Sequence, residues 1–225
     1  MTISFISAAS ANADSVAMPS HQQWDLLVAV VHRHASTTPP IVPSGWRVAQ
    51  VASGGSNVLI VAIQTASSSS EVSGTWTNAD QIGVAVYRSD SYLLSLTNGL
   101  QQTGVAGSGD NITHPKMNVP SPPTNKWLLA AFAHRSIDTD IEVGPTGLTT
   151  TRFDVVGGSA GELGLHDSNG NYSSWSSASY VLTTGTSSGY KVSMNELCET
   201  SAAIPSGGGG TTGRQGLHAI EAGAM

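Results

Sequence analysis

Two apolar runs far apart in the chain decide the fold. The first is Leu26-Leu27-Val28-Ala29-Val30-Val31-His32-Arg33, and the second is Leu128-Leu129-Ala130-Ala131-Phe132-Ala133-His134-Arg135. Each run is too short for a helix and is bounded by turn-forming residues. This combination predicts a strand that is buried on both faces or central in a sheet.

The similarity of the two runs extends to their neighbours. At the same spacing of 102 positions, Pro43-Ser44-Gly45-Trp46 aligns with Pro145-Thr146-Gly147-Leu148, and residues 16–20 align with 117–121 after a one-residue slip. Further along, Ile82, Val84 and Val86 correspond to Tyr190, Val192 and Met194 after a small insertion. The chain therefore divides into two sequence-related half-repeats, about 15–90 and 116–198, and duplication explains the shared His32/His134 and Arg33/Arg135.

The remaining apolar segments also have the character of strands. Expected strands include 16–20, 58–63, 74–77, 82–87, 180–183 and 190–194, and the alternation at 82–87 is typical of a strand with one buried face. No window has a clear 3.6-residue period. We therefore predict an all-β fold, a jelly-roll-like β-sandwich of eight to ten strands in one domain over residues 1–204.

The segments outside these strands are polar or glycine-rich. Residues 67–70 and 103–110 are expected to be surface loops. Residues 205–225 begin with a Gly-rich stretch, which predicts either a frayed tail or an assembly arm that becomes ordered against a neighbouring subunit.

Composition excludes several classes of function. The net charge of −6 and the scattered basic residues argue against nucleic-acid binding. No run approaches the roughly 20 apolar residues that cross a bilayer, so no membrane contact is expected. The N-terminal segment lacks the basic and continuous apolar regions of a signal peptide, and we interpret it as a mature start. A single cysteine, Cys198, leaves no intramolecular disulfide and no Cys-based zinc site.

Few residues have the spacing of a catalytic or metal site. His32 and His34 lie two apart on one face of a strand, which is metal-ligand spacing, but no carboxylate is near them in sequence and a structural role is favoured. Residues 167–171 resemble a calcium loop without its terminal Glu, and a turn explains them equally well. There is no Gly-x-Ser-x-Gly elbow and no phosphate-binding loop. We predict no catalytic residue, no metal and no cofactor.

Aromatic residues give the best candidate for a binding site. Trp46, Trp76 and Trp127 are interpreted as plugs for the ends of the core. A polar loop instead combines an aromatic ring with carboxylate and amide groups that could contact a sugar. The predicted carbohydrate-binding residues are Asp167, Asn171, Tyr172 and Trp175.

Four motifs resemble a known family. They are Trp24-Asp25-Leu26-Leu27-Val28-Ala29, Pro43-Ser44-Gly45-Trp46, Gly74-Thr75-Trp76-Thr77 and Val84-Ala85-Val86-Tyr87-Arg88. The pattern resembles a β-sandwich domain that recurs in bacteriophage virion proteins and in bacterial secreted proteins. The resemblance covers about residues 3–200, with Phe153-Asp154 where the second copy has an Arg-Tyr-Asp-like segment, and it departs from the family at Gln23-Trp24-Asp25, where Gly-Asp is usual.

The resemblance implies a setting and leaves two functions open. The first is a non-enzymatic structural subunit of a virion, as a capsid decoration, head spike or tail fibre component. Such a subunit would be made in the host cytoplasm, and its partners would be copies of itself and other virion proteins. The second is a carbohydrate-binding module that attaches a particle to a host-surface glycan.

Overall fold

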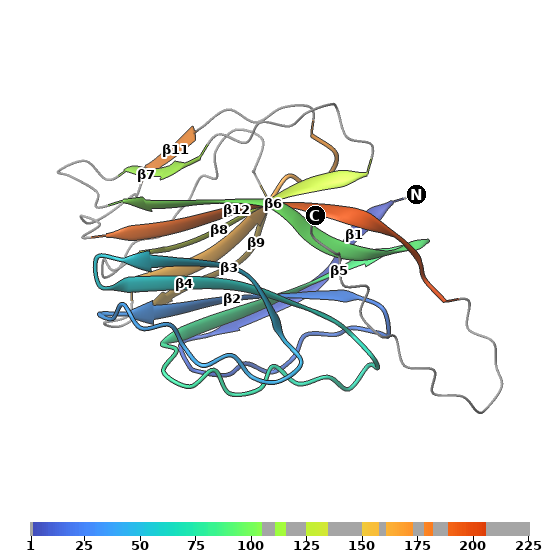
Figure 1. The fold of residues 1–225 in the computed structure, drawn as a ribbon, viewed down its shortest axis with the longest axis horizontal. Helices are drawn as coiled ribbons and strands as arrows, with labels where there is room; N and C mark the ends of the chain where they lie inside the picture. The colour runs from blue at the N-terminus through green and yellow to red at the C-terminus, as the bar shows by residue number, and fades with distance from the viewer. Residues whose placement is uncertain are drawn as a thin grey trace, which may run out of the picture.

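Two five-stranded antiparallel sheets face each other in the molecule (Figure 1). The structure is a computed structural model that describes residues 2–104, 111–115, 125–134, 150–157, 161–172, 178–181 and 189–205. The first sheet has the order β1-β5-β2-β4-β3, with bounds β1 Ile3–Ala11, β2 Leu26–His34, β3 Arg47–Gly54, β4 Asn57–Thr65 and β5 Gln81–Ser89. The second has the order β6-β12-β8-β10-β9, with bounds β6 Tyr92–Gly104, β8 Lys126–His134, β9 Thr150–Gly157, β10 Gly161–Asp167 and β12 Tyr190–Ala203.

The predicted all-β sandwich is confirmed, and the strand order shows how the chain forms its two sheets. The first sheet is formed by β1 to β5 and the second by strands from β6 to β12, so each sheet comes from one half of the chain. In chain order, the strands of the second sheet occupy the same positions in their sheet as β1 to β5 do in the first. A separate two-stranded ribbon pairs β7 (Asn111–His114) with β11 (Ala178–Val181) and lies beyond the second sheet in Figure 1. β7 lies in the connection between β6 and β8, and β11 lies in the connection between β10 and β12.

The apolar run of β2 is buried on both faces, as the sequence predicted. Leu26, Val28 and Val30 pack between the two sheets. The alternate residues of the run face the other side of the first sheet. That side is covered by the chain segments that precede β2, β3 and β5, which form a loop layer below the first sheet in Figure 1.

Two tryptophans belong to this loop layer and do not plug the core between the sheets, which corrects that prediction. The rings of Trp46 and Trp76 lie 5.7 Å apart, centroid to centroid, within the apolar cluster on the outer side of the first sheet. Both indole N–H groups donate to the Ser73 carbonyl oxygen at 3.1 Å. Trp127 does lie in the core between the sheets.

Two predicted strands are loops in the structure, and several strands of the structure were not predicted. Residues 16–20 and 74–77 form no strand, and Gly74 adopts the left-handed φ of +71° in a turn. Conversely, β1, β3, β6, β7, β9 and β10 were not predicted. Four of them, β1, β3, β6 and β9, are edge strands of the large sheets, which pair on one side only, so their sequences need less continuous apolar character than a central strand. The central strand β10 was missed because its sequence GELGLHD mixes apolar residues with glycine and charged residues.

The two sheets approach each other closely beside β5. A Cβ added to Gly83 would lie 2.2 Å from Cε2 of Phe153, a residue of β9 in the opposite sheet. Gly83 therefore leaves the space that the Phe153 ring occupies, and this contact helps to fix the distance between the sheets.

Candidate functional site

His32 and His34, which have metal-ligand spacing in the sequence, make different contacts in the structure. His32 is fully buried, and its Nδ1 lies 2.7 Å from Gln81 Oε1, with Nε2 against the side chain of Asn57. His34 is half-buried, and its ring lies 6.5 Å from that of His32. Within the described residues, no group of three His, Cys, Asp or Glu side chains could hold a metal ion.

His32 instead belongs to a polar network that joins the sheets. Burial lowers its pKa to about 4, because desolvation outweighs the hydrogen bonds from Gln81 and Asn57 that act in the opposite direction. Gln81 Nε2 donates to the carbonyl oxygens of Val155 and Gly161 in the second sheet. Because the Gln81 amide nitrogen is used in these bonds, Oε1 faces the ring, and we assign the proton of the neutral imidazole to Nδ1, which donates to Gln81 Oε1.

Asp167 is not available to a sugar, which corrects the sequence prediction for this residue. The side chain is fully buried, and its oxygens accept from Arg152 Nε at 2.5 Å and Nη2 at 2.8 Å. The Tyr87 hydroxyl donates to the same carboxylate at 2.9 Å, as does the backbone N–H of Asn169. This buried carboxylate therefore ties the turn to the core through its bonds from Asn169, Arg152 and Tyr87. The same bonds explain residues 167–171 as a turn.

The other predicted sugar-binding residues that the structure describes each contact a different part of the protein. Asn171 is exposed, and its Oδ1 accepts from the backbone N–H of Lys126 at 3.1 Å, at the start of β8. Tyr172 is half-buried and donates its hydroxyl to Glu196. Burial raises the pKa of Tyr172, and the Glu196 contact adds to this. Trp175 lies outside the described residues. Among the three of these residues that the structure describes, Asn171 is exposed, Tyr172 half-buried and Asp167 buried.

A second set of buried ionisable residues lies on the outer face of the second sheet. His134 Nε2 lies 2.7 Å from Glu162 Oε2, and both side chains are fully buried. Burial lowers the pKa of His134. The ring of His166 stacks on Phe132 at 5.3 Å. These histidines stabilise a packed face and line none of the surface hollows described next.

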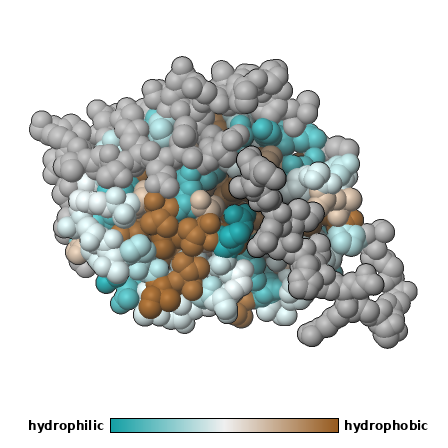
Figure 2. All heavy atoms as spheres, in the orientation of Figure 1, coloured by the Kyte–Doolittle hydropathy of each residue, from teal (hydrophilic) through white to brown (hydrophobic). Residues whose placement is uncertain are grey.

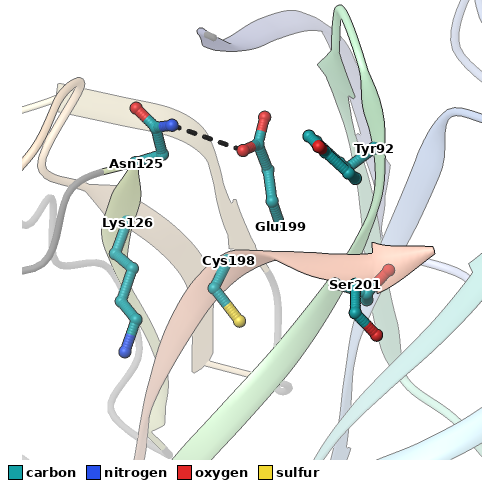
Figure 3. A pocket seen from close by; sticks show the side chains of 7 residues that line it. Tyr92, Asn125, Lys126, Cys198, Glu199 and Ser201 are labelled. Carbon is teal, nitrogen blue, oxygen red and sulfur yellow. Dashed lines mark hydrogen bonds between the residues drawn. The ribbon is translucent and has the colours of Figure 1, made fainter. Parts of the chain in front are cut away.

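A chain of hollows follows one end of the sandwich, where β6 and β8 begin and β12 approaches its end. The first hollow has a volume of about 490 Å³ and is lined by Tyr92, Asn125, Lys126, Cys198, Glu199, Thr200 and Ser201 (Figure 3). The second, of about 290 Å³, shares Asn125 with the first and adds Thr2, Ile3, Trp127, Asn169, Gly170 and Asn171. The third, of about 420 Å³, shares Thr200 with the first and is lined largely by the ends of β4 and β6.

The charged groups around the first hollow make hydrogen bonds or ion pairs with neighbouring side chains. Glu199 accepts from Asn125 Nδ2 at 3.3 Å and from the Ser89 hydroxyl. Lys126 Nζ forms an ion pair with Glu196 at 3.2 Å. Figure 3 shows Asn125, Glu199 and Tyr92 on one side of β12, with the Lys126 and Cys198 side chains on the other. The hollow therefore presents polar groups, the Glu199 carboxylate and an aromatic ring.

These hollow-lining residues were missed by sequence reasoning, except Asn171. Tyr92, Asn125 and Glu199 come from the ends of three strands that are distant in the chain, and only the strand pairing brings them together. Among the described residues, no helix is long and apolar enough to cross a membrane. No protein-family model, curated protein or solved structure matches the chain.

Proposed function

We propose that the protein is a non-enzymatic structural subunit of a bacteriophage or phage-like particle, in the role of a capsid decoration, head spike or tail fibre component. In this proposal the chain assembles with copies of itself and with other virion proteins, and its place is the released particle. The motif resemblance supplies the setting, and the surface of the first sheet supports the assembly.

Exposed apolar side chains on the outer side of the first sheet are the observation that carries this proposal. Ile41 and Val72 in the loop layer are 62% and 73% exposed, and Val48 on the edge strand β3 is 39% exposed. Figure 2 shows apolar residues gathered over this part of the molecule. An apolar area beside an unpaired strand edge favours contact with another protein surface, and a second copy of the chain is the partner proposed.

The use of the buried ionisable residues supports a role without catalysis. Asp25 holds Arg88 in a two-bond contact, with Arg88 Nε at 2.7 Å and Nη2 at 2.8 Å from its carboxylate oxygens. Asp167 holds Arg152 in the same way, and His32 is held by amides. Each of these groups is committed to a structural contact, so none is positioned to transfer a proton to a ligand.

The oligomeric state of the purified chain tests the proposal. We expect light scattering after size-exclusion chromatography to show an oligomer at micromolar concentration. Val72→Asp should shift it toward the monomer, whereas Ala203→Asp, at an exposed position of β12 in the second sheet, should not. Urea unfolding of both variants checks that they remain folded. A monomer at every concentration, with a stability unchanged by deletion of residues 206–225, would contradict the assembly.

The virion setting needs a separate measurement. An antibody against the purified chain should label particles released by lysis of the source bacterium, and the chain should co-sediment with them. Chain that is found only in the soluble fraction of the lysate, while particles are present, would refute the setting.

A further inference from the structure

We propose that the end of the sandwich around Asn125 is a binding groove for a neutral oligosaccharide. The groove consists of the two hollows that share Asn125, with volumes of about 290 and 490 Å³. Volumes of this order are typical of small-molecule sites, and two adjoining hollows suit a ligand made of linked units. This inference does not depend on self-assembly, because the exposed Ile41, Val48 and Val72 line neither hollow.

Three asparagine side chains give the groove its hydrogen-bonding groups. In each of them, one polar atom of the amide is hydrogen-bonded to the protein. Asn125 donates through Nδ2 to Glu199 at 3.3 Å. Asn169 accepts through Oδ1 from Arg152 Nη2 at 2.8 Å. Asn171 accepts through Oδ1 from the Lys126 backbone at 3.1 Å.

The second polar atom of each amide has no partner among the described residues. These atoms are Asn125 Oδ1, Asn169 Nδ2 and Asn171 Nδ2, which together provide one acceptor and two donors. An amide that is already oriented by the protein loses little conformational freedom when it binds a ligand. Sugar hydroxyls both donate and accept, so they match this mixture of groups.

The charges near the groove favour an uncharged ligand over an anionic one. Glu199, Lys126 and Arg152 each have an opposite charge or a hydrogen-bond donor or acceptor from the protein. A ligand carboxylate or phosphate would therefore find no unpaired cation here among the described residues. Neutral saccharides require only hydrogen-bonding groups and an apolar surface.

The apolar surface comes from Tyr92, a half-buried residue that lines the larger hollow. Figure 3 shows its ring near the Glu199 side chain, on the side of the hollow opposite Asn125. The face of a pyranose ring carries C–H groups, which pack on an aromatic face while the hydroxyls at the ring edge meet polar groups. Tyr92 and Asn125 could thus contact the same sugar unit from two sides.

Binding of a defined saccharide panel tests the inference. The full chain would be titrated by calorimetry with maltotriose, cellotriose, mannotriose and N,N′,N″-triacetylchitotriose, and with sialyllactose as an acidic comparison. We expect at least one neutral trisaccharide to bind with a Kd below about 1 mM, with sialyllactose weaker.

Variants then locate the site. Asn125 and Asn169 have φ values of +62° and +46°, so glycine replaces each amide without strain in the backbone. Asn125→Gly, Asn169→Gly and Tyr92→Ala should each weaken binding roughly fivefold to tenfold, because each removes one contact to the ligand. Tyr92→Phe, which keeps the ring, should stay close to wild type. Asn78→Gly is a matched control, because Asn78 also has a positive φ, of 71°, but lies in the loop before β5.

Three results would overturn the inference. They are the absence of binding by any neutral trisaccharide up to about 10 mM, equal binding by wild type and the three groove variants, and preference for sialyllactose. Binding that is lost in Trp175→Ala but kept in the groove variants would also overturn it, and would place a sugar site at the loop predicted from the sequence. Failure of any of these tests leaves the oligomeric state, and hence the assembly proposal, unaffected.

Discussion

Acidification should destabilise the fold through His32. The pKa of this residue is about 4 in the folded protein and 6.5 in an unfolded chain, so the unfolded state binds more protons between these values. The folded state therefore loses stability as the pH falls from about 6.5 to about 4. The difference of roughly 2.5 pKa units corresponds to about 3 kcal/mol in the free energy of unfolding.

The variant His32→Gln isolates this contribution. Glutamine keeps a polar side chain near Gln81 and Asn57 but does not titrate. At pH 7 the variant should be less stable than the wild type, because it replaces a buried imidazole that makes two contacts. Between pH 7 and pH 4 the stability advantage of the wild type should shrink by about 3 kcal/mol. The other histidines are present in both proteins, so their contributions cancel in the difference.

Urea unfolding at each pH, followed by the fluorescence of the buried tryptophans, measures both curves. The quantity of interest is the difference between the two free energies of unfolding as a function of pH. If that difference stays constant from pH 7 to pH 4, burial does not hold His32 neutral, and the proton assignment within its network is wrong.

Three further changes test the packing by urea unfolding. Asp167→Asn should cost about 3 kcal/mol, because it leaves the Arg152 guanidinium without its buried counter-charge, whereas Asp90→Asn at an exposed position should cost almost nothing; equal effects would refute a structural role for Asp167. Tyr87→Phe removes one donor to the same carboxylate and should cost about 1 kcal/mol, clearly less than Asp167→Asn. Gly83→Ala should cost roughly 1–3 kcal/mol through the clash with Phe153, and the cost should be smaller in a Phe153→Leu background; strictly additive effects would show that the two residues do not meet.

The central strands β2 and β8 could be predicted from the sequence because their local pattern and their burial agree. The runs in β2 and β8 are continuously apolar, and both become central strands packed on two faces. The edge strand β1 has the sequence ISFISAASA, in which small residues give little alternation. Its position is fixed by pairing with β5, a contact between segments about 80 residues apart, so no local pattern indicates it.

The candidate site was harder to predict for the same reason. The sequence grouped Asp167 with Asn171 because they lie four positions apart, but the chain turns between them. Asp167 then points into the core, and Asn171 remains at the surface. The groove residues Tyr92 and Asn125 carry no motif, and their proximity depends on strand order alone. Proximity in sequence was thus a poor guide to which polar groups share a surface.

The register of the repeat explains why His32 and His134 have different surroundings. In the first sheet Val31 pairs with Ile82, and in the second His134 pairs with Tyr190. If Ile82 corresponds to Tyr190, then their strand partners Val31 and His134 also correspond to each other. The sequence alignment instead matched His32 with His134, so the structural alignment of the two apolar runs differs from it by one residue. In a strand that is apolar on both faces, the hydrophobic pattern does not reveal a one-residue shift. Such a shift nevertheless moves every side chain to the opposite face of the sheet. His32 accordingly meets amides between the sheets, whereas His134 meets Glu162 on the outer face, so a shared motif has produced two unrelated polar contacts.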